Sequence, residues 1–92
     1  MILYRIEFTE AAHQAVVHLP PEIKREVKEG LRFLSWNPFV GEPLRRELEG
    51  KRKLRIRRYR IVYQLDARRR TIIIVAVGHR QNIYDDLSGQ TE

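Results

Sequence analysis

Basic residues recur at every second position between residues 51 and 57, the spacing at which successive side chains of a β-strand point to the same side. They are Lys51, Lys53, Arg55 and Arg57. In the segment that follows, Arg60 stands between the apolar residues Tyr59 and Ile61. Lysine and arginine side chains bind phosphate and carboxylate groups. The pattern therefore predicts a cationic surface, carried on strands, that binds an anion.

A second group of side chains that could take part in binding or catalysis follows the last apolar segment of the chain, at His79, Arg80 and Tyr84. A guanidinium group can hold a phosphate while a phenol ring stacks on a base. The alternatives are a structural histidine at a strand end and a Tyr84 that packs in the core. The chain has no cysteine, metal-ligand spacing, glycine-rich phosphate loop or Ser-His-Asp arrangement. We therefore expect no metal site and no cofactor.

The charge of the chain is concentrated in residues 51–80. This segment contains eleven Lys/Arg and one acid, Asp66, for a net charge of +10, whereas the other residues carry seven basic and eleven acidic side chains, for −4. Such asymmetry favours a polyanionic partner, of which nucleic acid is the commonest. A solvated basic face and a surface for an acidic protein are the alternatives. We expect no compensating charge for this segment within the protein.

The N-terminal half reads as one strand followed by two helices. Residues 2–8 alternate as a strand does, and Thr9 is an N-cap for a helix that runs to about Leu19. Pro20-Pro21 ends that helix and opens a second one, which carries one apolar stripe and ends at Asn37-Pro38. Two helices joined by so short a turn predict an αα-hairpin lying on a sheet.

The C-terminal half reads as a loop followed by three strands. The loop covers residues 38–50, and the strands are Lys51–Arg57, Tyr59–Leu65 and Thr71–Gly78. Short connections make these strands antiparallel neighbours. Their apolar residues face the helices, which leaves Lys53, Arg55 and Arg60 together on the uncovered face of the sheet.

The elements together predict an α+β fold. It has a small, mostly antiparallel sheet of about four strands with an N-terminal αα-hairpin on one face, in the order β-α-α-β-β-β. Residues 81–87 fit either a short helix or an extended tail, and we expect residues 88–92 to be disordered. We expect one domain over residues 1–92, no signal peptide, no membrane segment and a cytoplasmic location.

Several short motifs resemble the RelE branch of the RelE/ParE toxin superfamily. The main one is the run from Lys53 to Tyr63, KLRIRRYRIVY, followed by Val77-Gly78-His79-Arg80 and by Tyr84. Similar signals occur at Leu19-Pro20, Asn37-Pro38, Leu44 and Leu48-Glu49-Gly50. The resemblance covers residues 2–85. Many members have a glycine where Arg57 stands, so Arg57-Arg58 must form the tight turn here.

The resemblance implies a toxin of a type II toxin–antitoxin pair that enters the A site of the 70S ribosome and cleaves mRNA. The implied partners are a RelB-like cognate antitoxin, which forms a hetero-oligomer with the toxin, and the ribosome with its mRNA; no membrane is involved. Carried over by position, the catalytic residues are Lys53, Arg55, Arg60, Arg80 and Tyr84. The RNA-binding residues are Lys51, Arg52, Arg57, Arg58 and His79.

Cleavage of this kind begins when a 2′-OH attacks the neighbouring phosphodiester. It needs a base, cations for the developing dianion and an acid for the leaving oxygen. Either Lys53 or Tyr84 serves as the base, with His79, Glu47 and Glu49 in reserve. The alternative function is that of a ParE-like, non-catalytic inhibitor of DNA gyrase, and a third reading is an inert RNA-binding module.

Overall fold

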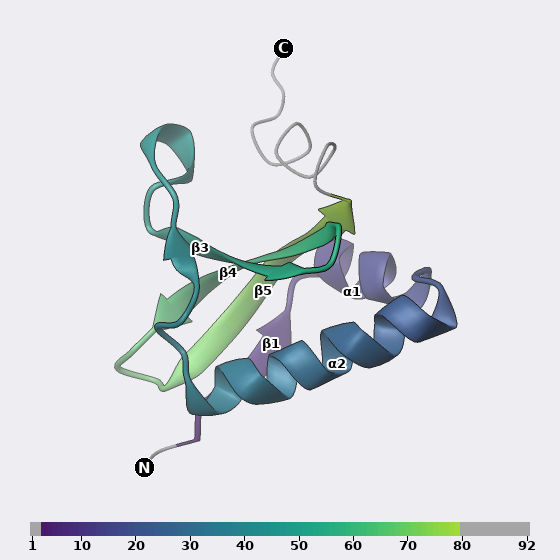
Figure 1. The fold of residues 1–92 in the computed structure, drawn as a ribbon. Helices are drawn as coiled ribbons and strands as arrows, with labels where there is room; N and C mark the ends of the chain where they lie inside the picture. Colours follow the sequence, from purple (N-terminus) through teal and green to yellow (C-terminus); the bar gives the residue numbers. More distant parts are fainter. Residues whose placement is uncertain (1–2, 80–92) are drawn as a thin grey trace.

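The computed structural model describes residues 3–79 of the chain. Within them, β1 (Arg5–Phe8) leads into α1 (Glu10–Val17) and α2 (Pro21–Trp36). The chain continues through β2 (Glu42–Pro43), the 3-10 turn η1 (Arg46–Leu48), β3 (Lys51–Ile56), β4 (Tyr59–Asp66) and β5 (Thr71–His79) (Figure 1). Each helix and strand predicted within these residues is present, with ends within about three residues of the expected ones. The short helix or tail expected over residues 81–87 and the disorder expected over 88–92 concern residues outside the described part.

The strands form one sheet in the order β1-β5-β4-β3-β2. β1 pairs with β5 in parallel, and the other three pairings are antiparallel. The predicted class is confirmed, but the expected count of about four strands is one too low. β2 is the missing strand. It comprises only Glu42 and Pro43, which is too short to show any periodicity, and it lies inside the segment expected to be a loop.

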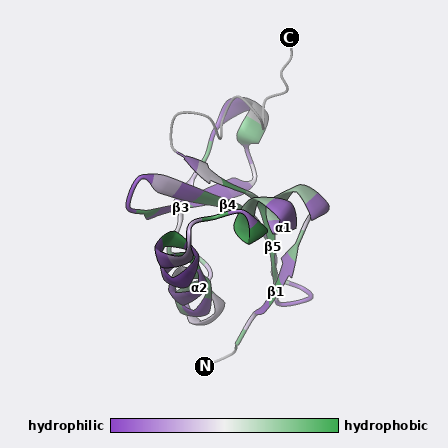
Figure 2. Ribbon diagram, turned by 90° about the vertical axis from the view of Figure 1, so that its right-hand side faces the viewer, coloured by the Kyte–Doolittle hydropathy of each residue, from purple (hydrophilic) through white to green (hydrophobic). Residues whose placement is uncertain are grey.

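Local sequence explains how both helices begin. The Thr9 side chain accepts a hydrogen bond of 3.1 Å from the Ala12 amide, which caps α1. α2 begins with Pro21. A proline lacks an amide hydrogen, but this costs nothing in the first turn, because amides there have no acceptor within the helix. α2 is largely hydrophilic outside its apolar stripe, as Figure 2 shows, so only one of its faces can pack.

Both helices pack on the same face of the sheet. The buried core joins Ala12 of α1 with an apolar stripe of α2 and with alternate residues of β4 and β5: Val27, Leu31, Leu34, Ile61, Tyr63, Ile72, Ile74 and Val77. Gly30 lets α2 approach β3 closely, because a Cβ there would stand 2.7 Å from the Ile56 Cδ1 atom. We call the opposite side of the sheet, which no helix of the described residues covers, the open face.

One buried tyrosine fastens the segment after α2 to the sheet. The Tyr63 hydroxyl accepts a hydrogen bond of 2.8 Å from the Gly41 amide and donates one of 3.0 Å to the Pro38 carbonyl. Burial raises the pKa of Tyr63 above its ordinary value of 10.0, although the Gly41 bond and the charge of Arg52 oppose this. The neutral phenol therefore stabilises the fold below pH 10, and this contribution is lost as the pH rises through the folded pKa.

Replacing Tyr63 by phenylalanine should lower the free energy of unfolding by about 1–2 kcal/mol, because Gly41 and Pro38 would each lose a partner. Urea denaturation measures this change. Tyr4→Phe is the matched control, since the Tyr4 hydroxyl makes no hydrogen bond within residues 3–79. Equal losses in the two variants would contradict the role given to the Tyr63 hydroxyl.

Candidate functional site

The register of β3 against β4 brings the basic residues of the open face together. Arg55 lies directly opposite Arg60, and Lys53 lies opposite Val62. Lys51, Lys53 and Arg55 alternate with the residues of β3 that pack toward the helices, so these three side chains and Arg60 lie on the open face. This confirms the predicted grouping of Lys53, Arg55 and Arg60.

The Arg55–Arg60 pair is electrostatically unfavourable. Like charges directly opposite each other on neighbouring strands destabilise a sheet by tenths of a kcal/mol. The Arg55 side chain donates to the Arg57 carbonyl at 3.2 Å, and Arg60 donates to the Tyr59 carbonyl at 3.3 Å. Neither arginine forms an ion pair within residues 3–79. A bound anion between them would remove the repulsion.

A glutamate that the sequence did not single out lies beside this cationic row. Glu42 of β2 pairs in register with Lys53, and its carboxylate is 3.7 Å from the Lys53 ammonium nitrogen. The Glu42 side chain is 73% exposed, so the pair is worth at most about 1 kcal/mol. No sequence signal marked Glu42, because β2 was itself missed. Of the two acids held in reserve, Glu49 is exposed after η1, and Glu47 lies within η1.

Arg52 faces the helices instead of the open face. It lies opposite Tyr63, and its guanidinium donates to the carbonyls of Gly41 at 2.7 Å and Phe39 at 3.1 Å. The same group lies 5.3 Å from the centroid of the Phe39 ring. Arg52 was expected to bind RNA, whereas the structure engages it in holding the segment that leads into β2.

Apart from Lys51, which lies on the open face at the start of β3, the other predicted RNA-binding residues lie at the end of the sheet where β3 turns into β4. Arg57 and Arg58 form the two-residue turn, with Arg57 in the left-handed region at φ 55°. The Arg57 Nε atom is 2.6 Å from a carboxylate oxygen of Glu26 on α2. His79 pairs with Tyr59 on the helix-facing side, where their ring centroids are 5.6 Å apart. Arg80 and Tyr84 lie outside the described residues.

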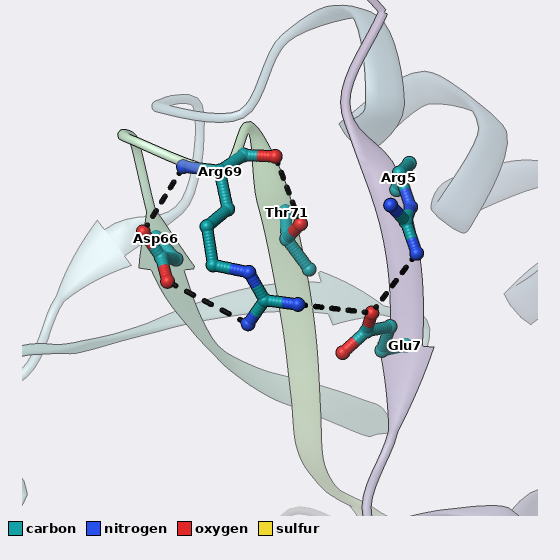
Figure 3. A network of polar contacts seen from close by, with 5 residues as sticks. All are labelled: Arg5, Glu7, Asp66, Arg69 and Thr71. Atoms are coloured by element: carbon teal, nitrogen blue, oxygen red, sulfur yellow. Dashed lines mark hydrogen bonds and ion pairs between the residues drawn. The ribbon is translucent and has the colours of Figure 1, made fainter.

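Acidic residues compensate part of the basic segment, which corrects the expectation that it has no partner charge. Glu26 and Glu42 pair with Arg57 and Lys53. At the opposite end of the sheet, Glu7 lies between Arg5 and Arg69, with ion-pair distances of 3.4 and 3.8 Å (Figure 3). Asp66 contacts the other side of Arg69, and its carboxylate also accepts the Arg69 amide at 3.2 Å.

Within residues 3–79, no group of three or more His, Asp or Glu side chains could hold a metal ion. The helices described there are also too short or too polar to cross a membrane. The basic side chains of the open face are fixed guanidinium and ammonium groups, which can bind an anion and stabilise its charge.

Comparison with known proteins identifies the family of this chain. Residues 3–84 match the family described as the ParE toxin of the type II toxin–antitoxin system parDE. The chain is 41% identical over 83 residues to Toxin RelG of Mycobacterium tuberculosis, covering 88% of this chain and 95% of that protein.

Solved structures of toxin–antitoxin complexes contain chains that are similar to this one. The RelBE2 toxin–antitoxin complex of M. tuberculosis contains a chain with a TM-score of 0.79 and 39% identity, covering 87% of this chain and 94% of that one. A chain of the RelBE complex of E. coli shares the fold, with a TM-score of 0.73 at 23% identity, covering 83% and 95%. With a family match over most of its length and a relative 41% identical, the chain belongs to the RelE/ParE superfamily of type II toxin–antitoxin toxins, within its RelE-like branch.

Proposed function

We propose that this toxin is a ribosome-dependent endoribonuclease that cleaves mRNA in the ribosomal A site and so inhibits translation. The observation that carries the proposal is the cationic row of Lys51, Lys53 and Arg55 on β3, with Arg60 directly opposite Arg55. These charges stand on a sheet face that no helix of residues 3–79 covers. A rigid strand holds them at fixed spacing, as the recognition of a phosphodiester backbone requires.

The reaction follows from the chemistry of RNA. The 2′-OH loses its proton to a base and attacks the adjacent phosphorus, while the bond from phosphorus to the 5′-oxygen breaks. The products are a 2′,3′-cyclic phosphate and a 5′-OH that takes up a proton. The guanidinium groups of Arg55 and Arg60 stabilise the dianionic transition state. Lys53 and Tyr84 are the two candidates for the base, and in this proposal Arg80 neutralises the leaving oxygen.

The relatives support this function over the alternative. A ParE-like toxin that inhibits gyrase by protein contact would not need paired arginines on an open sheet face. The relatives with 39–41% identity carry RelE-type names, whereas ParE is the name of the family whose model matches residues 3–84. We also place the proposed activity in the cytoplasm, where ribosomes translate mRNA.

Arg60→Ala should reduce mRNA cleavage by about 10²-fold or more, because it removes one of two guanidinium groups opposite the reacting phosphate. Primer extension on mRNA, after cell-free translation with the purified toxin, measures the cleavage. Arg68→Ala is the control, since Arg68 is exposed in the turn between β4 and β5. Gyrase-linked DNA damage with intact mRNA would instead establish the ParE-like alternative.

Glu42→Gln should increase affinity for RNA a few-fold, because it removes a carboxylate that pairs with Lys53 while keeping the side-chain shape. The increase should shrink as the salt concentration rises, since screening weakens exposed charges. Fluorescence anisotropy with a non-cleavable 2′-O-methyl RNA reports the affinity, and Glu49→Gln is the matched control. A loss of affinity in Glu42→Gln would mean that the carboxylate orders the site.

We further propose a RelB-like antitoxin as the partner that inactivates this toxin in a hetero-oligomer. The relative with 39% identity was solved as a toxin–antitoxin complex. The open face offers a row of cations to an acidic or amphipathic segment of such a partner.

Hydrogen exchange with and without the co-purified antitoxin tests where that partner lies. Direct masking predicts slower exchange in residues 51–63 or 79–86 when the antitoxin is bound. If a neutralising antitoxin left both segments unprotected, inhibition would arise from the bulk of the complex, which would be too large to enter the A site.

A further inference from the structure

A pocket of about 530 Å³ opens beside the turn between β3 and β4. Its walls are the three arginines Arg55, Arg57 and Arg58, together with Tyr59 of β4 and Ile23 near the start of α2. Pockets that hold small molecules usually have 300–1,000 Å³, so this one has room for a nucleotide. Of its lining residues, only Arg55 belongs to the cationic row described above.

The charges of the pocket are only partly satisfied by the protein. Glu26 neutralises Arg57, and Arg55 gives one hydrogen bond to the Arg57 carbonyl. Arg58 makes no ion pair or hydrogen bond within residues 3–79. Of the three guanidinium groups that line this concave site, only that of Arg57 forms an ion pair within residues 3–79. The site therefore has an excess of positive charge, which attracts an anion. Arginine suits phosphate in particular, because its planar fork binds two oxygens at once.

The apolar part of the pocket indicates a ligand that has an apolar or aromatic group as well as an anionic one. Ile23 and the Tyr59 ring supply apolar surface between the arginines. The Tyr59 ring is held edge-on by His79, with an interplanar angle of 75°. An aromatic ring among guanidinium groups is the combination with which proteins bind single-stranded nucleic acid, stacking on a base while holding its phosphate.

The pocket is continuous with the cationic row through Arg55, which lies opposite Arg60 on the sheet and also lines the pocket. From these contacts we infer that the pocket is a second nucleotide subsite, which binds the RNA strand next to the nucleotides on the open face. The inference rests on the proposed function, since it assumes that the strand on the open face is RNA.

Arg58→Ala tests the subsite directly. Binding of a non-cleavable 2′-O-methyl RNA oligonucleotide to the full chain should weaken about tenfold. The slope of log affinity against log salt should also fall by about 0.7, the value for one phosphate contact in a single strand. Arg68→Ala, an equal loss of charge at the other end of the sheet, should change neither quantity. Tyr59→Phe should retain binding, whereas Tyr59→Leu, checked for an unchanged urea midpoint, should lose it.

Lys53→Ala, measured in parallel, separates failure of the subsite from failure of the proposed function. If Lys53→Ala weakens RNA binding and Arg58→Ala does not, the subsite is wrong and the proposed function stands. If neither variant changes RNA binding, both are wrong. If Arg58→Ala weakens binding of the antitoxin and leaves RNA affinity unchanged, the pocket is a protein-docking site and the subsite is overturned.

Discussion

The two-residue turn between Ile56 and Tyr59 sets the register of β3 against β4, and the open face depends on that register. A slip of one residue would move Lys53 and Arg55 to the helix side and Leu54 and Ile56 into water. The turn holds Arg57 at φ 55°, a conformation that costs about 1–2 kcal/mol for a residue other than glycine. The exposed ion pair between Arg57 and Glu26 stabilises the turn by at most about 1 kcal/mol. The packing of Leu54, Ile56 and Ile61 against the helices must therefore supply the rest.

The face of the sheet to which each side chain belongs could be predicted from the sequence, because it follows from the periodicity of the strands. The alternation of residues 51–65 assigns each side chain to a face, and the structure confirms that assignment for Lys53, Arg55 and Arg60. Gly30 is unfavourable for α2 on its own, since glycine weakens helices by about 1 kcal/mol. The close approach of the Ile56 side chain explains why a larger residue would not fit there.

The features that could not be predicted depend on contacts between distant segments. β2 exists only because Glu42 and Pro43 meet β3, and two residues carry no pattern of their own. The roles of Arg52 and Glu42 follow from the path of residues 38–43, which Tyr63 fixes from more than twenty positions away. Composition shows that the segment 51–80 is basic, but not which of its charges are paired. The residues expected after β5, Arg80 and Tyr84 among them, lie outside the described part of the chain.

The distribution of acids distinguishes the two ends of the sheet and supports the proposal that one of them binds an anion. Near the turn between β4 and β5, Glu7 and Asp66 surround Arg69, so the parallel edge strand β1 is joined to that turn by opposite charges. Near the turn between β3 and β4, Glu26 pairs with Arg57 alone, and Arg58 has no ion pair within residues 3–79. Arg55 lies opposite Arg60, and neither forms an ion pair in that part of the chain. Proximity to Glu7 and Asp66 therefore separates a structural arginine such as Arg69 from those available to an anion. A count of basic residues alone cannot make that distinction, because the net charge of +10 in segment 51–80 includes both kinds.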